Sequence, residues 1–217
     1  MGARSSPGAG SADKSLSDDL RERLIDAALE LFVRQGYDAT SADQIAARAD
    51  ASPADFAKHF DDAEAVLVCI VDAMSHATAA ELQRTSKGVD PESALLSAGS
   101  AMVTAIVEGR GAVPLERLIA LARIVSATRN LHRKVSAARR RVIAPALADW
   151  MGVSVDNRRL QRALTMWSAV TASAYVTAAD LPDKYQPQRD SNLQQRMISN
   201  IAQSFSEVMG DHPRKPE

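Results

Sequence analysis

The chain has 217 residues, of which 46% are hydrophobic and 24% charged, and its formal net charge is −1. This length allows one or two domains with a substantial core. The single cysteine, Cys69, excludes an intrachain disulfide and any site built from several cysteines. No run approaches the ~18 apolar residues of a transmembrane helix, and the first residues lack a signal-peptide pattern. We therefore expect a cytoplasmic protein, and the net charge by itself argues against nucleic-acid binding.

The pattern along the chain predicts an all-α fold of about nine helices. Aromatic residues make up only 4%, and glycine and proline stand at isolated positions, unlike the turn clusters of all-β chains. Residues 1–16 have no apolar periodicity and are predicted to be a flexible arm. Ser17 then resembles an N-cap, followed by Asp18 and Asp19, and a helix is expected over 18–35 with Gly36 closing it.

Two short helices follow, each beginning after a serine. Ser41 precedes one of them, and Ser52, with Pro53 at the first helical position, precedes the other. Only Asp50 and Ala51 separate them. Two helices of about two turns joined by a tight turn have the dimensions of a helix-turn-helix, predicted here over residues 41–60.

The remaining helices are marked by local signals. Asp61 or Asp62 is expected to cap a long helix, Asp90-Pro91 to begin the next, and Pro114 to begin a third over 114–127. A helix from about Asn130 to Gly152 contains Pro145, which is expected to kink or break it. Asp156 is expected to cap a helix over 157–179. A final helix is expected over 191–209, with a tail at 210–217.

Sequence patterns for catalysis, metal binding or a cofactor are missing. There is no Walker A, no G-x-S-x-G and no H-E-x-x-H pattern, and the four histidines are far apart in the sequence. The paired carboxylates stand at predicted helix starts, where capping explains them. The sequence therefore predicts neither an enzyme nor a cofactor nor a metal site.

Residues 18–67 resemble the TetR/AcrR family of bacterial transcriptional regulators, with a profile match expected over about 18–78. The resemblance rests on Ile25 to Phe32, Gly36-Tyr37, Thr40-Ser41, Ile45-Ala46, Ser52-Pro53, His59-Phe60, Glu64 and Leu67. It implies a helix-turn-helix domain over 17–67, a ligand-binding and dimerisation domain over 68–209, and a homodimer. The family's DNA-contact positions correspond here to Ser41, Gln44, Ser52, Pro53, Asp55, Lys58 and His59.

Several of these positions depart from the family's pattern. Asp50 replaces the usual turn glycine, Asp55 a small or hydroxyl residue, Ala57 a tyrosine and Ala63 a lysine. Residues 17–67 hold five basic and twelve acidic side chains, a net charge of −7, whereas the other residues hold 21 basic and 15 acidic ones, or +6. Because phosphate neutralisation dominates affinity for duplex DNA, we expect weaker DNA binding than is typical of the family.

The resemblance also implies a ligand cavity in the C-terminal domain and a dimer interface made by its last two helices. Large side chains on the expected lining helices are the ligand candidates, namely Met74, Met102, Trp150, Trp167 and Tyr175. The alternative, which is favoured for any single one of them, is that it belongs to the ordinary core. Small residues at 169–179 and the apolar stripe of 193–208 give the interface candidates Ala172, Ala174, Ala178, Met197, Ile201 and Phe205. The alternative is that these two helices only fill a monomer core.

Residues 118–176 resemble the mycofactocin-type subfamily of these regulators, whose ligands include acyl-CoA thioesters. That resemblance implies that the basic run Arg139-Arg140-Arg141, and Arg140 in particular, could hold a CoA phosphate. The alternative is a solvated basic face.

The predicted function is a ligand-responsive repressor, released from a double-stranded DNA operator by a small apolar or acyl-CoA-like effector. The alternative is a degenerate dimer that binds a ligand or protein partner with weak or no DNA binding.

Overall fold

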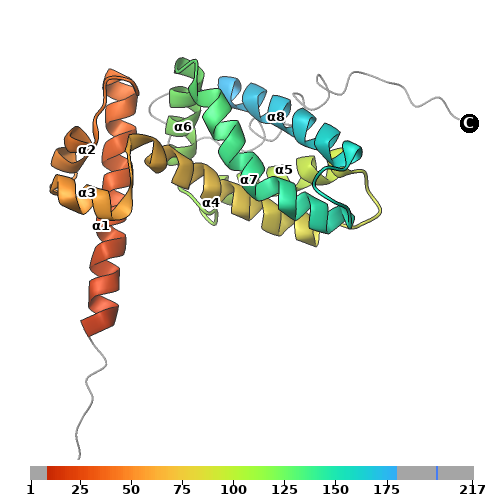
Figure 1. Ribbon diagram of the computed structural model, residues 1–217, viewed down its shortest axis with the longest axis horizontal. Helices are drawn as coiled ribbons and strands as arrows, with labels where there is room; N and C mark the ends of the chain where they lie inside the picture. The colour runs from red at the N-terminus through yellow and green to blue at the C-terminus, as the bar shows by residue number, and fades with distance from the viewer. Residues whose placement is uncertain (1–8, 180–198, 200–217) are drawn as a thin grey trace, which may run out of the picture. The chain divides into compact units, whose positions relative to one another are not determined.

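The structure is a computed structural model that describes residues 9–179 and 199. Within these residues it is all-helical, with no strand. Eight helices run in chain order: α1 Ala9–Gln35, α2 Ala42–Arg48, α3 Pro53–His59, α4 Ala63–Arg84, α5 Pro91–Val107, α6 Leu115–Ala127, α7 Leu131–Met151 and α8 Arg158–Ala179 (Figure 1). The predicted helix over 191–209 and the tail over 210–217 lie outside the described residues, apart from position 199. The chain divides into two compact units between Val66 and Leu67.

The N-terminal unit is built on α1, whose buried face packs α2 and α3 into one small core. Leu24, Ile25, Ala28 and Phe32 of α1 are all 3% exposed or less. They share this core with residues of the two short helices and of the segment that follows, namely Ile45, Ala46, Phe56 and Phe60. The apolar residues that carry the family resemblance therefore form the core of this unit.

α1 begins earlier than its sequence suggested. It starts at Ala9, so the flexible arm predicted over 1–16 is wrong for residues 9–16, and residues 1–8 lie outside the described part. Ser17, Asp18 and Asp19 are consequently inside the helix instead of capping it. The alanine and serine residues of this stretch lack an apolar stripe, yet alanine has the highest intrinsic helix propensity, and the apolar periodicity of a buried face is not required for a helix to extend into solvent.

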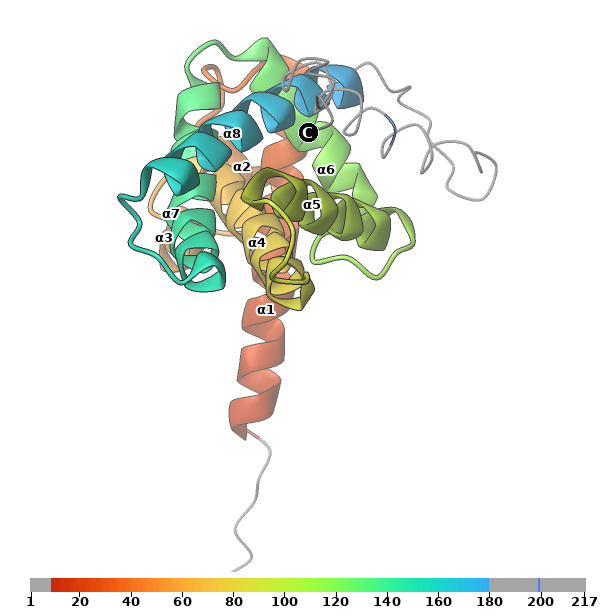
Figure 2. The same cartoon turned by 90° about the vertical axis from the view of Figure 1, so that its right-hand side faces the viewer.

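In the C-terminal unit, α8 packs against α5, α6 and α7 (Figures 1 and 2). Its core contains leucine, isoleucine and valine residues that are fully buried, among them Leu95, Leu121, Ile143, Leu147 and Leu160. α7 is not broken by Pro145, which lies inside one continuous helix. Gly152 ends α7 with a left-handed φ of 66°, as predicted.

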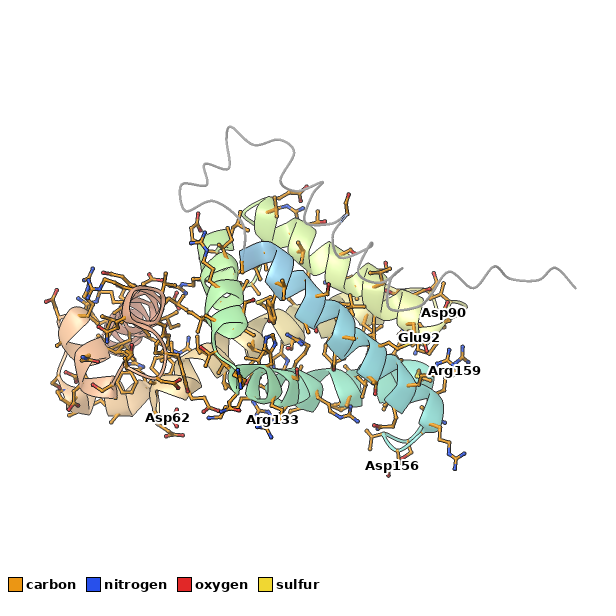
Figure 3. The ribbon with its side chains drawn as sticks, turned by 90° about the horizontal axis from the view of Figure 1, so that it is seen from above. Asp62, Asp90, Glu92, Arg133, Asp156 and Arg159 are labelled. Carbon is orange, nitrogen blue, oxygen red and sulfur yellow. The ribbon has the colours of Figure 1, made fainter. Side chains whose placement is uncertain are left out.

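The beginnings of α5 and α8 lie side by side (Figure 3). Asp90 is the predicted N-cap of α5, and its carboxylate accepts a hydrogen bond from the Ser93 N–H at 2.8 Å. Burial alone would raise the pKa of the Asp90 carboxyl, but the hydrogen bonds from Ser93 and the charge of Arg159 bring it below its ordinary value. α8 is capped by Asn157, whose side-chain oxygen accepts from Arg159 N–H at 2.9 Å, so the prediction of Asp156 as the cap was wrong by one residue.

The segment Pro53–Arg84 is long and apolar enough to cross a membrane by length and composition, with a mean hydropathy of 1.5 over 18 residues. This corrects the expectation that no such stretch exists. The chain is extended at Phe60, between α3 and α4, and 44% of the apolar window is buried inside the protein. Val66, Leu67, Ile70 and Val71 of α4 are at most 2% exposed, so their apolar character is accounted for by the core.

Candidate DNA interface and ligand cavity

The two helices of the helix-turn-helix are held by matching capping boxes. The Ser41 hydroxyl accepts from Gln44 N–H at 3.3 Å, and the Gln44 side chain accepts from Ser41 N–H at 2.9 Å. In α3, the Ser52 hydroxyl accepts from Asp55 N–H at 3.1 Å, while the Asp55 carboxylate accepts from Ser52 N–H at 3.3 Å and from its hydroxyl at 2.6 Å. Each box satisfies backbone donors that the first helical turn leaves open, so both predicted N-caps are confirmed.

The turn between α2 and α3 is closed by Asp50 in a left-handed conformation with a φ of 52°. Ala51 N–H donates to the Ala46 carbonyl at 2.9 Å, and Asp50 N–H donates to the Ala47 carbonyl at 3.3 Å. This is a Schellman closure, which usually has glycine at the left-handed position. Aspartate tolerates that region better than most residues, and the tight turn forms without glycine.

The two basic side chains in α2 and α3 are both paired with acidic ones. Arg48 makes a two-point contact with the Glu30 carboxylate at 2.5 and 3.2 Å, and Lys58 Nζ lies 2.8 Å from Asp55 Oδ1. The hydrogen bonds from Lys58 and Ser52 lower the pKa of the Asp55 carboxyl to about 2. The same contact raises the pKa of Lys58. Lys58 and Asp55 therefore both remain charged at neutral pH, and because their charges are opposite and adjacent, the pair adds little net positive charge to this surface.

The residues predicted to contact DNA therefore lie together on α2 and α3. Ser41, Gln44, Ser52, Pro53 and Lys58 are exposed, while Asp55 and His59 are half-buried. Four of the seven, Ser41, Gln44, Ser52 and Asp55, are engaged in capping. Asp55 thus has a structural role that its position in the family pattern did not indicate, and Arg48, which the sequence did not single out, lies at the end of the same module.

A cavity of about 70 Å³ lies within the C-terminal unit, lined by α4, α5, α6, α7 and α8. Four of the predicted ligand residues line it, namely Met74, Met102, Trp167 and Tyr175. The lining is mostly apolar, and Val71, Val103, Leu118, Ile143 and Val170 also contribute. Gly99 permits the close approach of Trp167, because a Cβ placed there would lie 2.1 Å from the indole ring.

Two predicted ligand residues lie elsewhere. The Trp150 indole N–H donates to the Thr85 carbonyl at 3.1 Å, so Trp150 helps to fasten α7 to the end of α4 and does not line the cavity. Arg140 is exposed and donates to the Gln161 side chain. Its neighbour Arg139 lines the cavity, because consecutive residues of a helix point about 100° apart. The three consecutive arginines therefore do not act as one cluster, and Arg141 pairs with Asp72 at 2.8 Å.

The predicted interface residues on α8 differ in their burial and in what they face. Ala174 and Ala178 border the cavity, Ala172 is half-buried, and the neighbouring Val176 is 55% exposed. Met197, Ile201 and Phe205 lie outside the described residues.

Two short capped helices joined by a tight left-handed turn and packed on a longer helix form a helix-turn-helix domain, here followed by a helical unit with an internal cavity. Residues 24–68 match the family described as bacterial regulatory proteins, tetR family. The chain is 35% identical over 89 residues to the HTH-type transcriptional regulator TcmR of Streptomyces glaucescens, covering 41% of this chain and 39% of that protein. The N-terminal domain, over residues 24–68, is therefore similar to the helix-turn-helix domain of the TetR family.

One solved structure shares this fold at low sequence identity, and a second superposes with a lower TM-score. The fatty acid degradation regulator FadR from Bacillus halodurans superposes with a TM-score of 0.54 and 11% identity, over 98% of this chain and 100% of that one. The Thermus thermophilus FadR, a TetR-family repressor in complex with lauroyl-CoA, gives a TM-score of 0.48 and 20% identity, over 91% of this chain and 99% of that one. The match to TcmR spans about two fifths of that relative's length.

Proposed function

We propose that the protein is a cytoplasmic, homodimeric transcriptional repressor that binds operator DNA through α2 and α3 and is released by a small effector bound in the C-terminal cavity. The observation that carries this proposal is the doubly capped helix-turn-helix, with the first turn of α3 and its exposed Ser52 and Pro53 presented together. In this module the start of the second helix enters the major groove.

The capping arrangement supports DNA binding in a second way. The caps fix the backbone of both short helices before DNA binds. Binding in the major groove therefore does not require a further loss of conformational entropy at their N-terminal turns. A small apolar effector is consistent with a mostly apolar cavity that contains Met74 and Met102, whose flexible side chains can adapt to a ligand. A homodimer would supply the two recognition helices that a two-half-site operator requires.

A second candidate function is a ligand-binding dimer whose helix-turn-helix has lost DNA binding. It is favoured by the pairing of Arg48 with Glu30 and of Lys58 with Asp55, together with the −7 charge of residues 17–67. Cations already neutralised by neighbouring acids release fewer counterions from DNA.

Fluorescence anisotropy with the DNA upstream of the protein's own gene separates the two, measured from about 50 mM to about 200 mM salt. Repressor function predicts saturable sub-micromolar binding that weakens steeply with salt. The Lys58→Gln variant should lower the salt slope by about one, whereas Arg110→Gln, an exposed arginine of the other unit paired with Glu108, should leave it unchanged. No binding at the lowest salt would remove the repressor function and leave the second candidate.

A further inference from the structure

The polar groups facing the C-terminal cavity differ from those of an ordinary core, because a guanidinium is buried there without a carboxylate. Arg139 is 8% exposed and lines the cavity. It donates to Thr171 Oγ1 at 2.7 Å and to the Tyr175 hydroxyl at 2.8 Å, and its guanidinium lies 5.4 Å from the Tyr175 ring centroid. Among the described residues no acidic side chain lies within ion-pair distance of Arg139.

Trp167, which also lines the cavity, carries a second buried donor. Its side chain is 7% exposed, and its indole N–H has no hydrogen-bond partner within the part of the chain that the structure describes. Leaving such a group unsatisfied is costly, so buried donors of this kind usually have an acceptor. Trp150 is the matched comparison, because its equally buried indole N–H donates to a backbone carbonyl.

The hydroxyl groups that line the cavity do not provide free acceptors for the N–H donors of Arg139 and Trp167. Ser75 and Thr78 both donate to carbonyls of their own helix, at 2.6 and 2.9 Å. Thr171 and Tyr175 already accept from Arg139. A guanidinium has five N–H donors, of which the two hydroxyls use only part. The cavity therefore offers N–H donors and one positive charge inside an apolar wall, and a complementary ligand must bring an acceptor and a negative charge.

We propose that the effector is an apolar organic monoanion, whose charged oxygen binds Arg139 with the Trp167 indole N–H as a second donor. This deepens the proposed function, since it names the chemical class that the same cavity would take. A buried cation gains most from a partner that is itself anionic and desolvated. One buried arginine fits a single anionic head, as in an apolar carboxylate or an ionised phenol, and does not match the several phosphate charges of a CoA.

The size of the cavity shapes the ligand. A volume of about 70 Å³ is below the roughly 300–1,000 Å³ of most ligand sites, so binding must move lining side chains. Met74 and Met102, both 8% exposed, are the flexible members of the wall. Aromatic and medium-chain acids are therefore the appropriate probes.

The experiment is isothermal titration calorimetry of the full chain without DNA, using acids paired with their neutral amides. The pairs are 2-naphthoate with 2-naphthamide and decanoate with decanamide; 4-nitrophenolate tests the phenol class and decanoyl-CoA the thioester class. We expect at least one acid or the phenolate to bind, and a bound acid to exceed its amide by about tenfold or more, as for loss of a hydrogen bond to a charged group.

Variants assign that preference to the arginine. Arg139→Met should abolish the preference for acid over amide, whereas Arg139→Lys should keep part of it. Arg140→Gln is the matched control, because this neighbouring arginine is exposed and lies outside the cavity, and it should bind the acids like the wild type. Thermal unfolding of the free Arg139→Met protein should show little loss of stability, because a buried charge without a counter-ion has been removed. Should that variant fail to fold, Arg139→Gln replaces it.

Several outcomes would overturn the proposal: equal binding of acid and amide by the wild type, an acid preference that survives Arg139→Met, binding of decanoyl-CoA alone, or binding of no probe. Binding of 4-nitrophenolate without the carboxylates would support it and assign the phenol class. Because the titrations contain no DNA, they are independent of operator binding. Acid binding without DNA binding would refute only the repressor function, and DNA binding without acid binding would refute only this inference.

Discussion

The two candidate sites of this protein, one in each unit, differ in how their charged side chains are partnered. In the N-terminal unit each of the acidic groups Glu30 and Asp55 meets a basic partner or a backbone N–H at the surface. In the C-terminal unit Arg139 is buried beside hydroxyls, and no acidic side chain of the described residues pairs with it. Surface ion pairs contribute little to stability, whereas a buried cation without a counter-ion is costly. A buried charged group without an oppositely charged neighbour therefore indicates a ligand more strongly than a surface group that is already paired with a neighbouring residue.

The largest expected effect tests whether the two units are separable. Ile45 is fully buried in the N-terminal unit, and Ile45→Ala should lower the free energy of unfolding of that unit by about 2–5 kcal/mol. Urea unfolding followed by circular dichroism measures this loss. The Ile45→Ala variant should lose DNA binding but still bind the organic acids in the C-terminal cavity. Ala47→Ser, at an exposed position of the same helix, is the control, and simultaneous loss of both activities in Ile45→Ala would contradict independent units.

A second change acts on the cavity wall. Gly99→Ala places a methyl group 2.1 Å from the Trp167 ring, which should cost about 1–3 kcal/mol as an overpacked core substitution. The indole must move, so its emission spectrum should shift in a Trp150→Phe background, where Trp167 is the remaining tryptophan of the chain. Gly88→Ala is the control, since nothing lies within 4 Å of its added Cβ. An unchanged Trp167 emission would show that the ring does not rest against Gly99.

A smaller effect should appear at the turn of the helix-turn-helix. Asp50 has a φ of 52°, and Asp50→Gly should stabilise the N-terminal unit by up to about 1 kcal/mol by removing a left-handed side chain. The same change removes an acidic group from a charged surface and should strengthen DNA binding. Asp50→Asn separates the two causes, because asparagine also tolerates this conformation but carries no charge. Thermal unfolding measures the stability and fluorescence anisotropy measures the DNA affinity. Destabilisation by Asp50→Gly would contradict the expected gain in stability.

The smallest effect concerns acid pH. The pKa of the Asp55 carboxyl is lowered to about 2 from its ordinary value of 3.8, so this carboxylate contributes stability that is present above the unfolded pKa and lost as pH falls through the folded one. The stability difference between wild type and Asp55→Asn should therefore be constant near neutrality and shrink between about pH 4 and pH 2. NMR titration of the Asp55 carboxyl checks its pKa, which should rise in Lys58→Gln. An unchanged midpoint in that variant would mean that Lys58 does not hold the carboxylate.

Local signals in the sequence predicted the structure where a short stretch of chain decides the outcome. Ser41 and Ser52 cap as predicted, and Gly36 and Gly152 end their helices with positive φ. The cap of α8 was missed by one residue because Asp156 and Asn157 are both good caps.

The ligand site was predictable only in part. Large side chains on the lining helices indicated Met74, Met102, Trp167 and Tyr175, and these do line the cavity. The sequence could not show which member of Arg139-Arg140-Arg141 faces inward, because a helical rotation of about 100° per residue gives each a different environment. Nor could it show that Trp150 serves the α4–α7 contact, since that depends on the distant Thr85 carbonyl. Which side of a helix meets a cavity depends on tertiary packing.

Pro145 interrupts the backbone hydrogen bonding inside α7. Proline has no N–H, so the Arg141 carbonyl lacks its donor from the next turn. Beyond this point the helix contacts the end of α4 and the segment after it, because Gln83 donates to the Ala146 carbonyl at 3.1 Å and Lys87 to the Trp150 carbonyl at 2.8 Å. Before Pro145, Arg141 pairs with Asp72 of α4 at 2.8 Å, so α7 is held on both sides of the position where one backbone hydrogen bond is missing.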